Sequence, residues 1–178
     1  MSRIRITGGE WRSRLVQVAD SVNGLRPTPD RVRVTLFNWL GQDLTGLSCL
    51  DLFAGSGILG FEAASRGAAL VTLVEQDQGA YAALQQNAQA LGSPKLELLR
   101  ADAVKFANST LQRYDLIFLD PPFRLAWLER IAPLLPRLAT PGARLYVEAE
   151  HAVETLGAWR SVRQNRAGQV FYQLLEQA

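Results

Sequence analysis

The sequence predicts an α/β fold in which a mostly parallel sheet of seven strands ends in an antiparallel hairpin, and a small β-hairpin precedes the sheet. From residue 47 onward, apolar stretches of strand length alternate with helical stretches, which is typical of βαβ units. Several of these strands are apolar almost throughout, as in a parallel sheet with both faces covered. The last two strand candidates are joined by a short connection, which requires an antiparallel pair.

The first segment, residues 1–27, reads as an appended basic arm. RIRIT and RLVQV alternate polar and apolar residues with a strand's period of two, and GGEWRS between them offers turn glycines. We therefore expect a small β-hairpin there, followed by one main domain over residues 28–178. Trp11 could stack on a nucleic acid or pack against the body, and the sequence leaves both open.

A helix is expected directly after the arm. Thr28 and Pro29 can cap it and form its first turn. Apolar residues then recur at helical spacing, at Val32, Leu36, Trp39 and Leu40. This helix should pack on the main body.

The sheet and its helices follow in alternation. The expected strands are residues 48–54, 71–75, 96–101, 114–120, 143–150, 159–165 and 168–177. The expected helices are residues 61–67, 79–92 and a short one near 103–110. Gly67 and Gly92 are suited to ending the first two of these helices.

Composition places the chain among ordinary globular proteins. The 178 residues are 48% apolar and 20% charged, and a chain of this length fits one core. No apolar run is long enough for a membrane helix and the N-terminus lacks a signal-peptide core, so we expect a cytoplasmic protein. Cys49 should be a reduced, buried strand residue, and His151, the only histidine, a surface residue. No metal site is expected.

The formal net charge of +2 conceals an asymmetry along the chain. Residues 1–40 hold seven arginines against three acids, a balance of +4, so the remaining 138 residues balance at −2. Basic residues gathered in one terminal segment suggest an anionic partner. The arginines suited to phosphate contacts are Arg3, Arg5, Arg12 and Arg14. A solvated strand face is the alternative.

A glycine-rich loop follows the first expected strand of the sheet. DLFAGSGILG places Gly55, Gly57 and Gly60 in the pattern GxGxxG between a strand and a helix. Glycines there allow a ligand to approach the backbone, and an acid at the end of the next strand, here Glu75, can accept hydrogen bonds from ribose hydroxyls. Nicotinamide and adenosylmethionine enzymes both need that acid, so Glu75 does not separate them.

Asp51 favours adenosylmethionine. A carboxylate just before the glycine loop is poorly placed beside a pyrophosphate but well placed for the cationic amino group of a methionyl moiety. The alternative is that Asp51 only accepts hydrogen bonds from the loop backbone. Asp102, after the expected strand 96–101, could accept from an adenine amino group, or it could cap the following helix.

The strongest signal is Asp120-Pro121-Pro122-Phe123, directly after the apolar strand YDLIFL. Two prolines end the strand and stiffen a loop at the carboxyl edge of the sheet, where open α/β sheets bind ligands. The Asp120 carboxylate and the Pro121 carbonyl could hold the protons of an exocyclic base amine and direct its lone pair at a methyl donor. Phe123 would stack on that base. A rigid turn with Phe123 in the core is the alternative.

These motifs resemble, in their order, a Rossmann-like class I S-adenosyl-L-methionine-dependent methyltransferase, and DPPF is similar to the [D/N]PP[Y/F] motif of amine methylation. RITGGEWRSR, LRPTPDRVRVTLFNWL and AGQVFYQL resemble the ribosomal RNA small subunit methyltransferase D family over nearly the whole chain. The resemblance implies methylation of the N2 amine of one guanine in 16S ribosomal RNA, within the small subunit or an assembly intermediate. It also implies a cytoplasmic monomer that does not bind membranes.

The resemblance assigns residues to three groups. The cofactor site would comprise Asp51, Phe53, Gly55, Ser56, Gly57, Glu75, Gln76, Asp102 and Ala103. The catalytic turn that holds the guanine would be Asp120, Pro121, Pro122 and Phe123. The RNA contacts would be Arg3, Arg5, Arg12, Arg14, Arg26 and Arg31. One departure is visible: in the family pattern an acid follows the second arginine of RVR, and here Val34 stands there, which puts any role of that position in doubt.

Three other functions are compatible with parts of the sequence. An adenine-N6 methyltransferase acting on RNA or DNA could use the same DPPF chemistry, although a DNA enzyme usually has a further recognition domain. A nicotinamide-dependent oxidoreductase could use GSGILG but would leave DPPF without a role. An RNA-binding assembly factor without catalysis would tolerate loss of Asp120.

Overall fold

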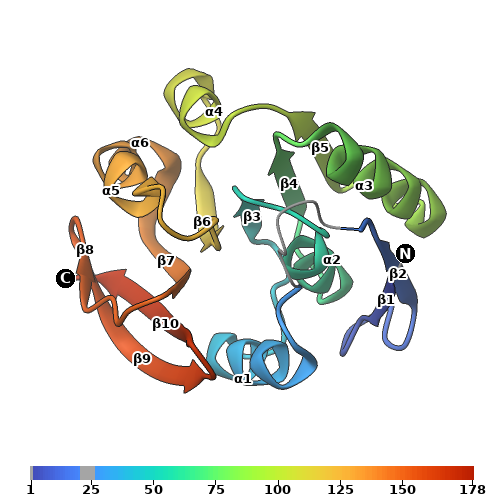
Figure 1. The fold of residues 1–178 in the computed structure, drawn as a ribbon, viewed down its shortest axis with the longest axis horizontal. Coiled ribbons are helices and arrows are strands. Elements are labelled where there is room, and N and C mark those ends of the chain that lie inside the picture. Colours follow the sequence, from blue (N-terminus) through green and yellow to red (C-terminus); the bar gives the residue numbers. More distant parts are fainter. Residues whose placement is uncertain (1, 21–26) are drawn as a thin grey trace.

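The computed structural model describes residues 2–20 and 27–178, and within them one sheet dominates the fold (Figure 1). Its strand order is β5-β4-β3-β6-β7-β10-β9-β8. The first five strands in that order are parallel, and β10, β9 and β8 are added in antiparallel fashion. The strands are β3 (Ser48–Asp51), β4 (Leu70–Glu75), β5 (Leu96–Arg100), β6 (Tyr114–Leu119), β7 (Ala139–Ala149), β8 (Thr155–Leu156), β9 (Trp159–Ala167) and β10 (Val170–Gln177).

The sequence predicted seven strands for this sheet, and the structure has eight among the described residues. The additional strand is β8, which pairs Thr155 with Arg160 and Leu156 with Trp159. Gly157, with a φ of 58°, helps turn the chain between β8 and β9. A strand of two residues is too short to give an alternating pattern, so the sequence could not reveal it.

Helices cover both faces of the sheet (Figure 1). The first face carries α1 (Asp30–Leu40), α2 (Ile58–Ser65) and α3 (Gln78–Leu91). The second carries α4 (Ala103–Ser109), α5 (Trp127–Ile131), the 3₁₀ turn η1 (Ala132–Leu134) and α6 (Leu135–Leu138). Two buried apolar clusters result, one on each face. This arrangement explains why the central strands are apolar on both sides. No helix of the described residues has the length and apolar character needed to span a bilayer.

Helix α1 begins as the sequence predicted, but Thr28 does not cap it. Pro29 occupies the cap position and no side chain accepts a hydrogen bond from the first turn. The Thr28 hydroxyl instead donates to Glu148, at 3.1 and 3.2 Å from its two carboxylate oxygens. A buried hydroxyl takes the strongest acceptor within reach, and here that acceptor is a carboxylate.

The sequence reading assigned no element to residues 127–138, where the structure has α5, η1 and α6. Pro133 and Pro136 lie within this stretch. Proline breaks the helical hydrogen-bond ladder, so the segment forms three short turns instead of one helix. Its apolar side, which includes Ile131, Leu135 and Leu138, is buried against the second face of the sheet.

The N-terminal hairpin forms as predicted, from β1 (Ser2–Arg5) and β2 (Leu15–Val18). Its inner side chains Ile6, Trp11 and Val16 belong to the same buried cluster as α1 and α2. Trp11 is 7% exposed, so it packs on the body and does not offer its ring to a partner. The hairpin therefore contributes to the main core.

Candidate active site

The carboxyl ends of three neighbouring central strands bring together three acidic side chains. Asp51 is the last residue of β3, and it lies beside Phe118 of β6 in the parallel register. Leu119 of β6 lies beside Val147 of β7, so Asp120 and Glu148 are the next residues of the two strands. The sheet topology alone thus gathers carboxyl groups at the edge where open α/β sheets bind ligands.

The glycine loop lies beside these acids and is closely packed. A Cβ atom on Gly57 would lie 2.4 Å from Leu84 Cδ2, and one on Gly60 would lie 2.7 Å from Leu73 Cδ2. Gly55 differs, because a Cβ atom there would meet nothing within 4 Å. Gly60 therefore allows α2 to approach β4, and Gly57 allows the loop to approach α3, whereas Gly55 borders open space that a ligand could enter. Ser56, between them, is half-buried and its hydroxyl accepts from the Ile58 N–H.

Asp51 is 1% exposed and accepts a hydrogen bond from the Gly60 N–H at 3.1 Å. The pKa of Asp51 is raised to about 7, chiefly by burial. The Gly60 hydrogen bond lowers this pKa, and the nearby Glu75 and Glu148 carboxylates raise it. Asp51 thus accepts a hydrogen bond from the loop backbone, which is the alternative role that the sequence left open for it. A cationic ligand group at this point would stabilise the ionised form that burial disfavours.

Glu75 links the glycine loop to the start of α3. Its two oxygens accept from the Gly55 N–H and the Asp77 N–H, each at 2.8 Å. The side chain is half-buried, and the neighbouring Gln76 is exposed. This geometry holds a carboxylate at the mouth of the open space beside Gly55, where it could accept from ribose hydroxyls.

Asp102 caps helix α4, as one reading of the sequence predicted. Its Oδ1 accepts from the Lys105 N–H at 3.0 Å. The side chain is half-buried, and Ala103, which follows it, is buried. Capping leaves the second carboxylate oxygen able to accept from another donor, so the adenine-contact prediction stays open.

The Asp120-Pro121-Pro122-Phe123 turn leaves the sheet immediately after β6. Pro121 is buried, Asp120 and Pro122 are half-buried, and Phe123 is 40% exposed, so Phe123 is not a core residue. Arg124 and Ala126, just beyond, have φ values of 71° and 53°. Such left-handed conformations are uncommon for residues other than glycine and often occur at functional turns. The turn therefore presents a free aromatic ring beside a carboxyl group.

Sequence reasoning missed Glu148, Tyr146 and Thr28. Glu148 is 5% exposed, and its Oε1 accepts from the Tyr146 hydroxyl at 2.8 Å. The Asp120 carboxyl lies beside Glu148 and Thr28. Burial, with the adjacent Glu148 and Asp51 carboxylates, raises the pKa of Asp120 well above its ordinary value, and the nearby Thr28 hydroxyl opposes that shift. The sequence did offer one signal for Glu148: it is a glutamate in the otherwise apolar strand segment YVEA. A buried glutamate needs a hydrogen-bond or ion-pair partner, so this position could have been singled out.

An aromatic pair lies next to the glycine loop. Phe53, half-buried, meets Trp127 edge-on with ring centroids 5.4 Å apart. The Trp127 Nε1 is the one buried side-chain nitrogen or oxygen within the described part of the chain that lacks a hydrogen-bond partner. Buried donors are almost always paired. An unpaired donor adjoining Phe53 is consistent with a bound group that completes this region.

The predicted RNA-contact arginines are exposed wherever the structure describes them. Arg26 lies outside the described residues, and the others are Arg3, Arg5, Arg12, Arg14 and Arg31. Arg14 donates to the Ala90 carbonyl, near the end of α3, and the Trp11 N–H donates to Ser65, the last residue of α2. Because both helices run away from the carboxyl edge, Arg12 and Arg14 lie toward the opposite edge of the sheet.

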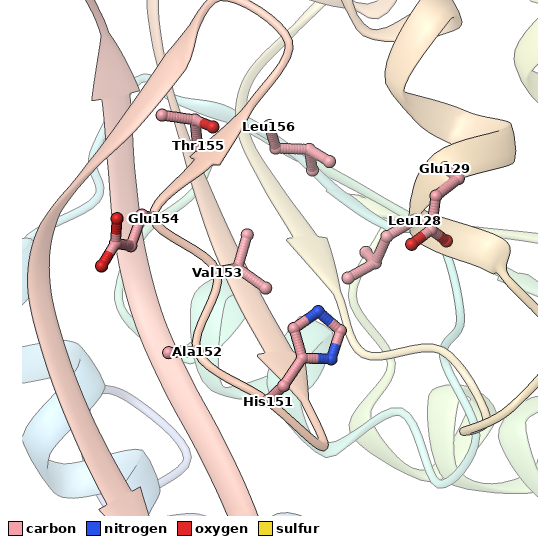
Figure 2. Close-up of a pocket in the computed structure, with 8 residues that line it drawn as sticks. All are labelled: Leu128, Glu129, His151, Ala152, Val153, Glu154, Thr155 and Leu156. Atoms are coloured by element: carbon pink, nitrogen blue, oxygen red, sulfur yellow. The ribbon is translucent and has the colours of Figure 1, made fainter.

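A shallow pocket near α5 does not involve the predicted site residues. Figure 2 shows it lined by Leu128 and Glu129 together with the segment 151–156. His151 is exposed there, as the sequence predicted. Cys49, in contrast, is buried in β3, and burial raises the pKa of its thiol to about 12, which suppresses the nucleophilic thiolate.

The site fits S-adenosyl-L-methionine by its hydrogen-bond acceptors and by the open space beside Gly55. Asp51 can meet an ammonium group, Glu75 can meet ribose hydroxyls, and the open side of Gly55 leaves room for backbone contact. A dinucleotide fits less well, because the buried Asp51 carboxylate would repel a pyrophosphate. The geometry is therefore compatible with a methyl-donor site beside the Asp120 turn.

Comparisons with known proteins identify the family of this chain. The family described as Conserved hypothetical protein 95 matches residues 4–176. The chain is 42% identical over 179 residues to the ribosomal RNA small subunit methyltransferase D of Escherichia coli strain K12, covering 98% of this chain and 90% of that protein. The Haemophilus influenzae protein of the same name is 39% identical over 181 residues, covering 97% and 93%. A solved putative methyltransferase from Escherichia coli superimposes with a TM-score of 0.88 at 40% identity, covering 99% of this chain and 98% of that chain.

Proposed function

Because this chain belongs to the family of the ribosomal RNA small subunit methyltransferase D proteins, we propose that it methylates the exocyclic N2 amine of a specific guanine in 16S ribosomal RNA. S-adenosyl-L-methionine is the cofactor, and S-adenosyl-L-homocysteine is the product derived from it. The chain acts as a cytoplasmic monomer on the small subunit or on an assembly intermediate. The observation that carries the proposal is the Asp120-Pro121-Pro122-Phe123 turn, which adjoins the glycine loop at the carboxyl edge of the sheet.

The chain's residues divide the work of binding the methyl donor. The Asp51 carboxylate binds the ammonium group, Glu75 accepts from the ribose hydroxyls, and Asp102 accepts from the adenine amine. The rest of the cofactor site is formed by the glycine loop together with Phe53, Ser56, Gln76 and Ala103. When bound, the donor supplies an activated methyl group on a positively charged sulfur.

The acceptor turn prepares the base amine. A ring-attached amine is a weak nucleophile because its lone pair is delocalised into the ring. The Asp120 carboxyl and the Pro121 carbonyl accept hydrogen bonds from the two N–H groups of the amine. These hydrogen bonds localise the lone pair on nitrogen and direct it at the methyl carbon. Phe123, 40% exposed in the free protein, stacks on the guanine, a contact worth about 1–3 kcal/mol. Pro122 keeps the turn rigid.

RNA binding is assigned to the basic residues around the hairpin and α1. Arg3, Arg5, Arg12, Arg14 and Arg31 are exposed, so they are free to contact phosphates without unfolding the hairpin. Arg26 joins them in the proposal from its position in the sequence. These arginines contact the phosphate backbone of the RNA, which carries no sequence information. Recognition of one guanine therefore depends on the shape of the folded RNA around it.

The decisive test identifies the product. The purified chain is incubated with tritiated S-adenosyl-L-methionine and small-subunit RNA, free or in particles, and the labelled nucleosides are separated and identified by mass. We expect label in N2-methylguanosine. Label in N6-methyladenosine would redirect the proposal to the adenine alternative, and the absence of any label from every RNA form would reject it.

A further inference from the structure

Glu148 is a buried acid that the proposed chemistry leaves unused. It follows Val147 on β7 just as Asp120 follows Leu119 on β6, and these strands are parallel neighbours. Glu148 is 5% exposed, and the strand register places it beside Asp120. Two carboxyl groups can share a hydrogen bond only when one of them carries a proton. A hydrogen bond between Asp120 and Glu148 would therefore require that the pair holds one proton and one negative charge.

The remaining partners fix how Glu148 is oriented. Its Oε1 accepts from the Tyr146 hydroxyl at 2.8 Å, and the Thr28 hydroxyl donates at 3.1 Å to Oε2. Thr28 is held in turn by Arg33, whose Nε donates to the Thr28 carbonyl at 2.9 Å. Two donors and a neighbouring carboxyl thus leave Glu148 little freedom to rotate.

Within residues 2–20 and 27–178, the charged groups that act on Asp120 are acidic and do not neutralise the pair. Asp51, on β3, adds a further acid, and the hydroxyls of Tyr146 and Tyr172 are titratable groups nearby in this part of the chain. Arg33 is the nearby cation, but its guanidinium is already paired with Glu62 at 2.8 Å and with Asp30. Sharing a proton would let these two adjacent carboxyls avoid repulsion.

We propose that Glu148 is a positioning residue that shares one proton with Asp120 and thereby fixes the Asp120 oxygen that accepts from the target amine. This inference rests on the proposed function. As the nitrogen–methyl bond forms and the sulfur–methyl bond breaks, the bond's electron pair stays on sulfur and the amine becomes positively charged. One amine proton then passes to the singly charged pair, which becomes neutral and later releases that proton to water.

The test compares Glu148→Gln with Glu148→Ala. A glutamine can accept from Tyr146 through its oxygen and donate to Asp120 through its amide, so it reproduces the protonated partner. We expect Glu148→Gln to keep kcat within about threefold of the wild-type value, and Glu148→Ala to lose at least about tenfold, with KM for the methyl donor unchanged in both. Glu150→Gln, an exposed acid directly after β7, is the matched control and should behave as wild type.

The pH profile is the readout that a purely structural role would leave unchanged. Without a second carboxyl group beside it, Asp120 should ionise at lower pH, so the acid limb of kcat for Glu148→Gln should move down by about one pH unit. Wild-type kcat and pH profile in both variants would overturn the proposal. A folded Glu148→Gln protein that is as inactive as Glu148→Ala would also overturn the proposal. That result would mean that catalysis needs a negative charge on Glu148 and not a shared proton.

A second measurement does not depend on catalysis. Asp51→Asn removes the other carboxyl group that is partly protonated at neutral pH. In that background, infrared difference spectra of the free protein should show the band of a protonated carboxyl group at neutral pH, and Glu148→Gln should weaken it. If wild type methylates no RNA while this band behaves as expected, the proposed function fails and the shared proton stands. If wild type is active and the band is unaffected by Glu148→Gln, the shared proton is refuted.

Discussion

At the scale of single residues, the buried Asp51 carboxyl makes the free energy of unfolding depend on pH. Its buried carboxyl has a pKa raised from 3.8 to about 7, chiefly by burial. The folded chain therefore holds this proton more tightly than the unfolded chain does, and the free energy of unfolding falls as pH rises from 3.8 to about 7. Above that range the protein carries a buried charge whose natural partner is a cationic ligand.

Asp51→Asn should separate these two effects. Asparagine can still accept from the Gly60 N–H but carries no charge, so we expect the variant to be more stable at pH 8, by on the order of 2 kcal/mol. Its affinity for S-adenosyl-L-methionine should fall at least about tenfold, because the ammonium group loses its counter-charge. Urea unfolding and calorimetric titration measure the two quantities. Unchanged cofactor affinity would remove Asp51 from the ammonium site.

The same residues show what a sequence can reveal about a site. The glycine loop, Glu75 and the Asp120 turn were predictable because each follows a recognisable strand, and the structure brings them to one edge. Glu148 and Thr28 were not, because their importance depends on pairing across β7 and α1 and leaves no local pattern. The Thr28 hydroxyl was expected to cap helix α1. In the structure it instead donates to the Glu148 carboxylate, 120 residues away in the sequence.

At the scale of elements, a buried ionic network fastens the hairpin and α1 to α2. Glu62 accepts from the Thr7 N–H at 2.9 Å and pairs with Arg33 at 2.8 Å and Arg66 at 2.7 Å. Both partners of each pair are almost fully buried. Removing one member of such a network leaves uncompensated charge in the interior, which is far more costly than losing a surface ion pair.

We therefore expect Glu62→Gln to lower the free energy of unfolding by about 3–5 kcal/mol. Exchange of the Thr7 amide hydrogen should accelerate as well, since its acceptor loses its charge. Denaturant unfolding and hydrogen exchange measure these effects. Glu10→Gln, an exposed acid in the hairpin turn, is the control and should change little. Equal stability of the two variants would show that the network does not anchor the hairpin.

Elements were predictable to the extent that their signals were local. The parallel strands, the antiparallel C-terminal pair and the helices α1, α3 and α4 have apolar patterns or caps that specify them. The stretch 127–138 lacks such a pattern because two prolines interrupt it, and β8 is too short to show one. The buried inner side of the hairpin was also hidden, since burial of Trp11 depends on α2 and not on its own neighbours.

At the scale of the whole molecule, positive charge is concentrated in the first 40 residues and the rest of the chain is slightly acidic. If the hairpin contacts phosphates, each lost contact should reduce the number of counterions released on binding. Replacing Arg3, Arg5, Arg12 and Arg14 by glutamine should weaken RNA binding and flatten its dependence on salt. Filter binding over a series of salt concentrations measures both.

A charge-matched control separates contact from net charge. Arg160, Arg163 and Arg166 on β9 are exposed, as is Arg130 in α5, so replacing these four with glutamine removes the same charge elsewhere. We expect the control to retain most of the salt dependence. Equal flattening in both variants would mean that the hairpin has no special role, and an unchanged slope in the hairpin variant would remove it from the RNA interface.

The central claim is that Asp120 presents the target amine to the methyl donor, and single-turnover methyl transfer to small-subunit RNA tests it most directly. Asp120→Ala should lower the transfer rate by on the order of 100-fold or more while cofactor affinity stays near the wild-type value. Asp120→Asn, which keeps an acceptor oxygen, should retain part of the rate. Wild-type transfer by a folded Asp120→Ala protein would contradict the account.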